Sequence, residues 1–133
     1  MDEKTLSLLR GSLEKADEKL VAAKDLFKLK HYDDAVSRSY YAAFHAAQAV
    51  LLTEGLTADT HQGVVNLFGL HFVKRGKFDS RFGKFLSNLK DDRENGDDEI
   101  YSTIDEETAR EAVREGEEFL SEAKRFLKKE AGL

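Results

Sequence analysis

The chain of 133 residues contains no cysteine, no proline and no tryptophan. Without cysteine it can form no disulfide, no thiolate zinc site and no cysteine nucleophile. Its longest nearly apolar stretch, Tyr40 to Leu52, is broken by His45 and Gln48 and is too short to span a bilayer. The first residues lack the basic start and apolar run of a secretory signal. We therefore expect a cytoplasmic protein with no membrane partner.

The composition is that of a folded domain, since 41% of the residues are hydrophobic and 35% are charged. The formal net charge is −5, but it is unevenly spread. Residues 71–90 are strongly basic, with Asp79 as their one acid, whereas residues 91–99 are acidic around Arg93. This pattern indicates either a local site for an anionic partner or two ordinary solvated surfaces.

Apolar residues at spacings of three and four predict long amphipathic helices and nothing resembling a strand pair. The first helix is expected from Thr5 to Lys28. The second is expected from Asp34 to Thr53, with Asp33 or Asp34 as its N-cap and Gly55 as its C-cap. Because residues 40–52 are apolar on nearly every side and include five alanines, this helix should be central, with neighbours on several faces.

Three further helices complete the expected fold. The third should begin after a Thr60 cap and end near Gly76, and the fourth should run from Asp79 or Ser80 to Asp92. The fifth should follow an Asp105 cap. With no repeat or linker in the sequence, residues 1–133 are predicted to form one all-α domain, an antiparallel bundle of about five helices.

The second helix carries the best polar constellation of the chain. At 100° per residue, Arg38, Tyr41 and His45 share one face, with Gln48 nearby. A guanidinium beside an imidazole can hold a phosphate and move its proton. Alternatively, Asp34 and Arg38 form an ordinary helix ion pair and His45 is a core histidine with a hydrogen-bond partner.

Two other segments are candidates for binding. Lys77, Arg81 and Lys84 form a basic stripe beside the phenylalanines of the fourth helix, which either follows a nucleic-acid backbone or covers the core with its aliphatic stems. Arg93 lies among carboxylates, next to Asp92 and near Asn95. This segment is either a polar recognition site or a flexible acidic loop.

Several catalytic and metal-binding patterns are missing. The sequence has no Glu-x-x-His, no His-x-x-x-His, no phosphate-binding glycine loop and no serine elbow. We therefore expect neither a metal nor a cofactor.

Residues 32–47, which read YDDAVSRSYYAAFHAA, resemble the HEPN domain family, and in particular its small stand-alone prokaryotic members. Shorter pieces in the family's order extend the resemblance over roughly residues 5–128: Gly55–Leu56, Thr60–Val64, Phe82–Lys84 and Leu89-x-x-x-Arg93.

The resemblance implies a five-helix up-and-down bundle that forms a homodimer. HEPN proteins act as ribonucleases, pair with nucleotidyltransferases in toxin–antitoxin systems, or bind nucleotides and RNA. The ribonucleases carry Arg-x(4–6)-His on a late helix, where Arg93 matches the arginine, but no histidine follows His71 and the usual Asp-Tyr reads Asp97-Asp98, with Tyr101 displaced. Arg38 and His45 have the spacing but lie on the second helix.

These observations lead to three hypotheses. The first is a nucleotide- or RNA-binding protein, or a partner of a nucleotidyltransferase, with a ligand site drawn from the second and fourth helices. Its residues are Arg38, Tyr41, His45, Gln48, Asp92, Arg93 and Asn95. The second is a metal-independent ribonuclease in which Arg93 and His45 are catalytic. The third is a structural interaction domain.

Overall fold

The computed structural model describes residues 1–98, 100 and 104–133, without the side chain of Asp98. Tyr101, which the resemblance to the HEPN family singles out, lies outside them. The elements are helices α1 (Glu3–Lys28), α2 (Tyr32–Leu52), α3 (His61–Phe68), the π-helical turn η1 (Gly69–Val73), α4 (Ser80–Asp98) and α5 (Glu106–Ala131). The described residues contain no strand, so the predicted all-α class is confirmed.

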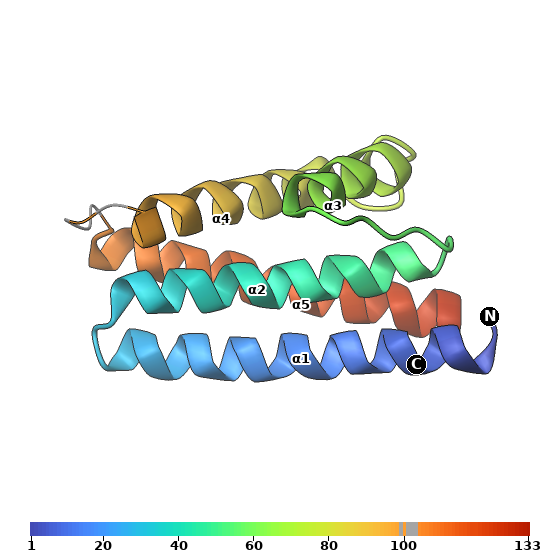
Figure 1. Ribbon diagram of the computed structural model, residues 1–133, viewed down its shortest axis with the longest axis horizontal. Helices are drawn as coiled ribbons and strands as arrows, with labels where there is room; N and C mark the ends of the chain where they lie inside the picture. The colour runs from blue at the N-terminus through green and yellow to red at the C-terminus, as the bar shows by residue number, and fades with distance from the viewer. Residues whose placement is uncertain (99, 101–103) are drawn as a thin grey trace.

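The four long helices run up and down alongside one another, and short α3 lies over one end of the bundle (Figure 1). Both ends of the chain lie at that same end. Helix α2 packs against α1, α3, α4 and α5, which confirms its predicted central position. Its alanines permit this close packing, since Ala42, Ala43, Ala46, Ala47 and Ala49 are all fully buried.

Polar caps begin three of the helices. The Thr60 hydroxyl accepts from Gly63 N–H at 2.9 Å, and the Asp105 carboxylate accepts from Thr108 N–H at 2.8 Å, as the sequence predicts. Asp2 caps α1, which was not predicted. The predicted cap of the second helix is wrong, because α2 starts at Tyr32, before Asp33 and Asp34.

A tight turn between α1 and α2 explains that early start. Lys30 has φ +65°, and its N–H donates to Phe27 O at 3.0 Å. The next N–H, that of His31, donates to Leu26 O at 2.9 Å. This pair of bonds closes α1 within three residues, so the chain re-enters a helix at once. The end of α2 uses the same device: after the C-cap Thr53, Gly55 has φ +67°.

The third and fourth helices differ from their predicted extents. The expected helix from Thr60 to Gly76 is divided, because α3 ends at Phe68 and continues as η1. Helix α4 extends beyond the predicted end at Asp92 to Asp98. Two ion pairs at a spacing of four stabilise this extension, Lys90–Glu94 and Arg93–Asp97.

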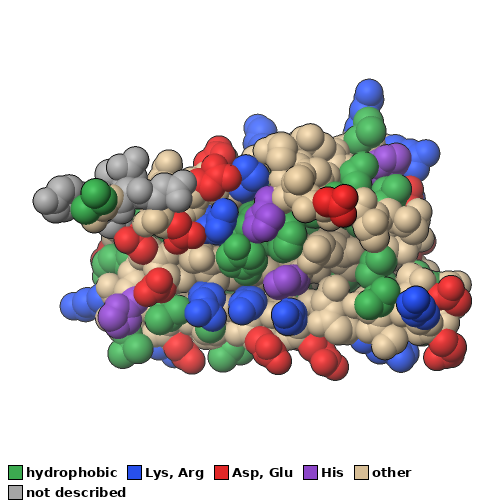
Figure 2. All heavy atoms as spheres, viewed as in Figure 1, with side chains coloured by type: hydrophobic (Ala, Val, Ile, Leu, Met, Phe, Trp, Pro, Cys, Tyr) green, Lys and Arg blue, Asp and Glu red, His purple; other side chains and the backbone are tan. Residues whose placement is uncertain are grey.

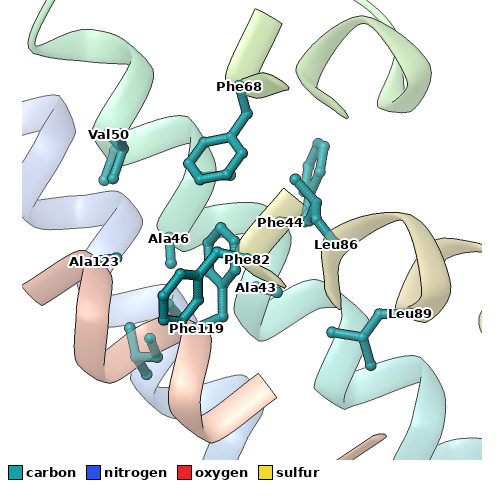
Figure 3. Close-up of a cluster of buried hydrophobic side chains, with 14 of the residues drawn as sticks. Ala43, Phe44, Ala46, Val50, Phe68, Phe82, Leu86, Leu89, Phe119 and Ala123 are labelled. Carbon is teal, nitrogen blue, oxygen red and sulfur yellow. The ribbon is translucent and has the colours of Figure 1, made fainter. Parts of the chain in front are cut away.

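The core lies between α2, α4 and α5, with Phe68 entering from α3 (Figure 3). Phe82 and Leu89 of α4 are buried as the helical pattern predicts. Helices α2 and α5 approach closely at Gly116, where an added Cβ would lie 3.1 Å from the carbonyl oxygen of Ser39. This packing fixes the positions of α2 and α4, the two helices that supply most of the candidate site.

Candidate functional site

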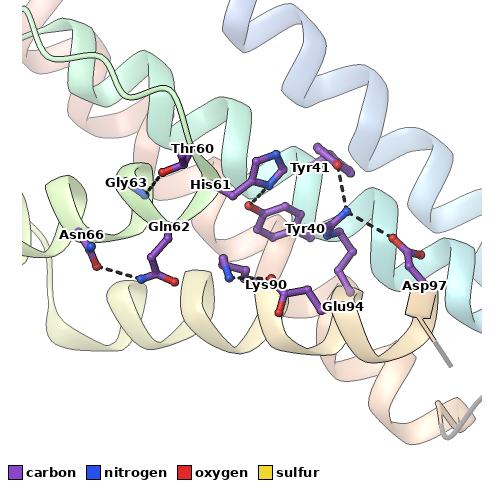
Figure 4. Close-up of polar contacts among 11 residues, drawn as sticks. Tyr40, Tyr41, Thr60, His61, Gln62, Gly63, Asn66, Lys90, Glu94 and Asp97 are labelled. Carbon is purple, nitrogen blue, oxygen red and sulfur yellow. Dashed lines mark hydrogen bonds and ion pairs between the residues drawn. The ribbon is translucent and has the colours of Figure 1, made fainter.

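Arg93 of α4 lies at the centre of a polar and aromatic cluster on α2 (Figure 4). Its Nη1 donates to the Tyr41 hydroxyl at 3.1 Å and lies 3.4 Å from Asp97 Oδ2. Only 21% of its side chain is exposed. Its Nε is buried and has no acceptor among the described residues. An unsatisfied buried donor is costly, so this guanidinium is held in place without all its partners.

Aromatic rings hold the guanidinium from α2. Its central carbon lies 5.4 Å from the centre of the Tyr40 ring and 5.5 Å from that of Tyr41. Both distances permit a cation–π attraction. Because Tyr40 is fully buried, it gives the arginine a rigid support. The charge of Arg93 is therefore fixed at the surface of α2.

His61, the first residue of α3, is the functional residue that the sequence analysis missed. Its Nδ1 shares a 2.7 Å hydrogen bond with the Tyr40 hydroxyl, and its ring stacks on Phe44 at 4.5 Å between centroids. Burial lowers the pKa of His61, and the positive charges of Arg93 and Lys90 lower it further. The imidazole is therefore neutral at pH 7. Its position directly after the Thr60 cap was the available signal, but the contact with Tyr40 depends on tertiary packing.

His45 lies one turn after Tyr41 on α2, with the two ring centroids 6.1 Å apart. Its Nδ1 lies 3.1 Å from Gln48 Oε1. Since an amide oxygen only accepts, Nδ1 is the donor, and Nε2 of the neutral ring carries a free lone pair. Burial lowers the pKa of His45, although the Gln48 hydrogen bond opposes this shift.

Basic side chains stand on both sides of the two histidines. Lys15 and Lys19 of α1 are close enough to lower the pKa of His45 through their charge. On the α4 side, Lys90 is 14% exposed and donates to Glu94 at 2.7 Å. Figure 2 shows histidine, hydrophobic and basic side chains together in the middle of the face formed by α1, α2 and α4. We call His45, His61 and Arg93 the histidine–arginine cluster.

The cluster has the chemistry of a phosphate site. Arginine offers planar, charged donors to phosphate oxygens, and a neutral imidazole can accept or pass on a proton. The acids beside the cluster, Glu94 and Asp97, are both 41% exposed and already paired with Lys90 and Arg93. An incoming phosphate can replace them as the anionic partner.

The structure brings together some of the predicted ligand residues and separates others. Tyr41, His45 and Gln48 form one contact chain, to which Arg93 is joined. Arg38 is exposed outside it, and neither its predicted ion pair with Asp34 nor a bond to His45 is present among the described residues.

The residues beside Arg93 face other directions. Asp92 lines a pocket of about 480 Å³ between α4 and α5, together with the buried Glu115. Asn95 is exposed on α4. The acidic segment therefore contributes one residue, Arg93, to the histidine–arginine cluster.

The basic stripe is also divided. Lys77 precedes α4 and donates to Glu54 at 2.8 Å. The Arg81 guanidinium lies 4.8 Å from the centre of the Phe82 ring, which partly occupies it. Lys84 lines a shallow pocket of about 580 Å³ beside η1. These three residues lie apart from the histidine–arginine cluster in their contacts.

Two searches of the described part of the chain gave negative results. No group of three or more His, Asp or Glu side chains there is arranged to hold a metal ion. No helix in that part combines the length and apolar content needed to cross a membrane.

Comparison with known proteins places the chain. Residues 9–127 match the HEPN domain. A protein of Methanocaldococcus jannaschii named "Putative toxin" is 40% identical over 122 residues, which cover 90% of this chain and 89% of that protein. A second protein of that organism with the same description is 31% identical, over 90% of this chain and 81% of its own length. A UPF0332 protein of Thermotoga maritima is 35% identical over 85% of this chain and 86% of its own. The chain is a member of the HEPN domain family.

Proposed function

We propose that this protein binds RNA or nucleotides through their phosphate groups at the histidine–arginine cluster. The observation that carries the proposal is the state of Arg93, a largely buried guanidinium fixed on two tyrosines, with Nε lacking an acceptor. The toxin role named for two relatives is consistent with RNA as the target, since a protein that sequesters or cuts RNA can arrest growth.

The charges around the cluster support an anionic ligand. Lys15, Lys19 and Lys90 surround it, while both of its imidazoles have a lowered pKa and are neutral at pH 7. Uncharged imidazoles can approach a phosphate without the cost of ion-pair desolvation, and they gain a proton when the phosphate stabilises it. The cluster thus combines a permanent charge with two groups that respond to the ligand.

Titration with a short single-stranded RNA at low salt tests the proposal. We expect Arg93→Gln to weaken binding at least tenfold, because each arginine–phosphate contact is charge-assisted. Arg125→Gln is the matched control, since Arg125 is 81% exposed on α5 and pairs only with Glu122 among the described residues. The control should bind as tightly as the wild type. Equal binding by the wild type and Arg93→Gln would refute the proposal.

A second candidate function is metal-independent RNA cleavage, favoured by the two histidines beside Arg93. The free Nε2 of His45 can take the proton from a ribose 2′-hydroxyl, whose oxygen then attacks the adjacent phosphorus. The bond to the 5′-oxygen breaks, and His61 in its protonated form supplies a proton to that oxygen. Arg93 stabilises the charge that develops on the phosphate. The products are a 2′,3′-cyclic phosphate and a free 5′-hydroxyl.

Cleavage of a labelled RNA in EDTA tests this second function. If both histidines transfer protons, His45→Ala and His61→Ala should each reduce the rate by about a hundredfold. A substrate with 2′-deoxyribose at the cleaved position should stay intact. Cleavage that is equally fast in both variants would exclude this mechanism and leave phosphate binding as the function.

Membership of the HEPN family supports two further proposals about partners. The first is that the chain forms a homodimer, which sedimentation equilibrium tests directly. The second is that it binds a nucleotidyltransferase as the other half of a toxin–antitoxin pair. Co-purification with the product of an adjacent nucleotidyltransferase gene, if one is present, tests the second proposal.

A further inference from the structure

A small pocket continues from the histidine–arginine cluster along α2. Its volume is about 190 Å³. It lies between the first half of α1, the last turns of α2 and the loop that follows. Its lining consists of Leu8, Ser12, Gln48, Leu51, Leu52, Leu56, Thr57 and Ala58. Such a volume admits one flat ring system and is too small for larger ligands.

Gln48 connects this pocket to the cluster. It lines the pocket with part of its side chain, while its Oε1 accepts the hydrogen bond from His45 Nδ1. Its amide N–H groups have no acceptor among the described residues and can donate to a ligand in the pocket. The contacts therefore run without a break from Arg93 through Tyr41 and His45 to the pocket.

The spacing suits one nucleotide. Tyr41, which holds Arg93, and Gln48 are seven residues apart on α2, which is about 10 Å along the helix axis. His45 lies midway between them. A phosphate at Arg93 and a base at Gln48 would place the ribose beside the His45 imidazole.

The lining of the pocket also suits a base. Leu51, Leu52 and Leu56 provide apolar walls for the faces of a planar ring. Ser12 and Thr57, together with Gln48, offer donors and acceptors for its polar edge. Ser12 lies one turn before Lys15 on α1, so the same helix presents a polar group to the pocket and a positive charge to the cluster.

Resting on the proposed function, we infer that this pocket receives the base of the nucleotide whose phosphate lies at Arg93. A base inside the pocket cannot be paired with another strand. The preferred ligand is therefore a free nucleotide or an unpaired nucleotide of single-stranded RNA.

Calorimetric titration with AMP, UMP and ribose 5-phosphate tests the inference. At least one nucleotide should bind ten times more tightly than ribose 5-phosphate, which carries the phosphate without a base. Thr57→Trp places a large ring at the mouth of the pocket from an exposed loop position. In this variant the nucleotides should fall to the affinity of ribose 5-phosphate, whose own affinity should not change.

Asp59→Trp is the matched control, because Asp59 is exposed in the same loop but does not line the pocket. It should bind all three ligands like the wild type. If nucleotides and ribose 5-phosphate bind equally well to the wild type, the base pocket is refuted while phosphate binding stands. If none of the three binds, the proposed function itself fails for free nucleotides, and the base pocket fails with it.

Discussion

Nη1 of Arg93 and the hydroxyl of Tyr41 form a 3.1 Å hydrogen bond between side chains that are 52 residues apart in sequence. This bond joins the second half of α4 to the polar face of α2. It also fixes the direction of the guanidinium, since the Tyr41 ring lies against the same group. The arrangement makes Tyr41 a positioning residue for Arg93.

Removing the Tyr41 hydroxyl should therefore affect both stability and binding. Tyr41→Phe should lower the free energy of unfolding by about 1 kcal/mol through the lost hydrogen bond. It should weaken RNA binding by roughly threefold to tenfold, because Arg93 is less ordered. Tyr32→Phe is the control, since the Tyr32 hydroxyl donates to Glu106 away from the cluster. Denaturant unfolding and RNA titration measure the two effects. Unchanged RNA binding in Tyr41→Phe would contradict the positioning role.

Two glycines in helices predict opposite effects of the same substitution. At Gly116 an added methyl group would meet the buried backbone of Ser39, so Gly116→Ala should destabilise the protein by about 1–3 kcal/mol. At Gly11 no atom lies within 4 Å of the new Cβ. Gly11→Ala should stabilise α1 by about 0.5–1 kcal/mol. Thermal unfolding of both variants measures the difference, and a shift of the same sign in both would be inconsistent with the close packing of α2 on α5.

Glu115 predicts a dependence of stability on pH. Burial, and then the negative charge of Glu111, raise the pKa of Glu115 from 4.5 to about 7 in the folded protein. The folded state therefore holds a proton that the unfolded state releases near pH 4.5. The resulting stability is fully present below pH 4.5 and is lost as the pH rises through 7.

The variant Glu115→Gln removes this loss. Relative to the wild type, it should be more stable at pH 8 than at pH 5 by about 1–2 kcal/mol, a value reduced for partial solvent contact. Glu130→Gln, at an exposed position of the same helix, should show no such difference between the two pH values. Urea unfolding at both pH values measures it. A pH-independent effect of Glu115→Gln would show that the carboxyl titrates normally.

The helices and some of their caps could be predicted from sequence because they depend on local patterns. Thr60 and Asp105 cap helices through residues three positions away. The central position of α2 followed from its uniform apolarity. The end of α4 was misplaced because the acidic residues after Asp92 suggested a loop, whereas Lys90 and Arg93 pair with them along the helix.

The candidate site could be predicted only in part. Tyr41, His45 and Gln48 share a face because they share a helix, and spacing alone gives that result. Which residues of other helices meet that face depends on tertiary packing. The partners of Tyr40 and Tyr41, His61 and Arg93, lie 21 and 52 positions away. Arg38 has the right face but no neighbouring element to bring a partner to it.

The four histidines of the chain allow the most direct test of the central claim. Imidazole proton signals can be followed by NMR over a pH titration, with and without a saturating single-stranded RNA. A phosphate at the histidine–arginine cluster should raise the pKa values of His45 and His61, which are lowered in the free protein, because it stabilises their protonated forms. The signals of His31 and His71, which lie outside the cluster, should not move when RNA is added. RNA binding that leaves the His45 and His61 titrations unchanged would contradict the account.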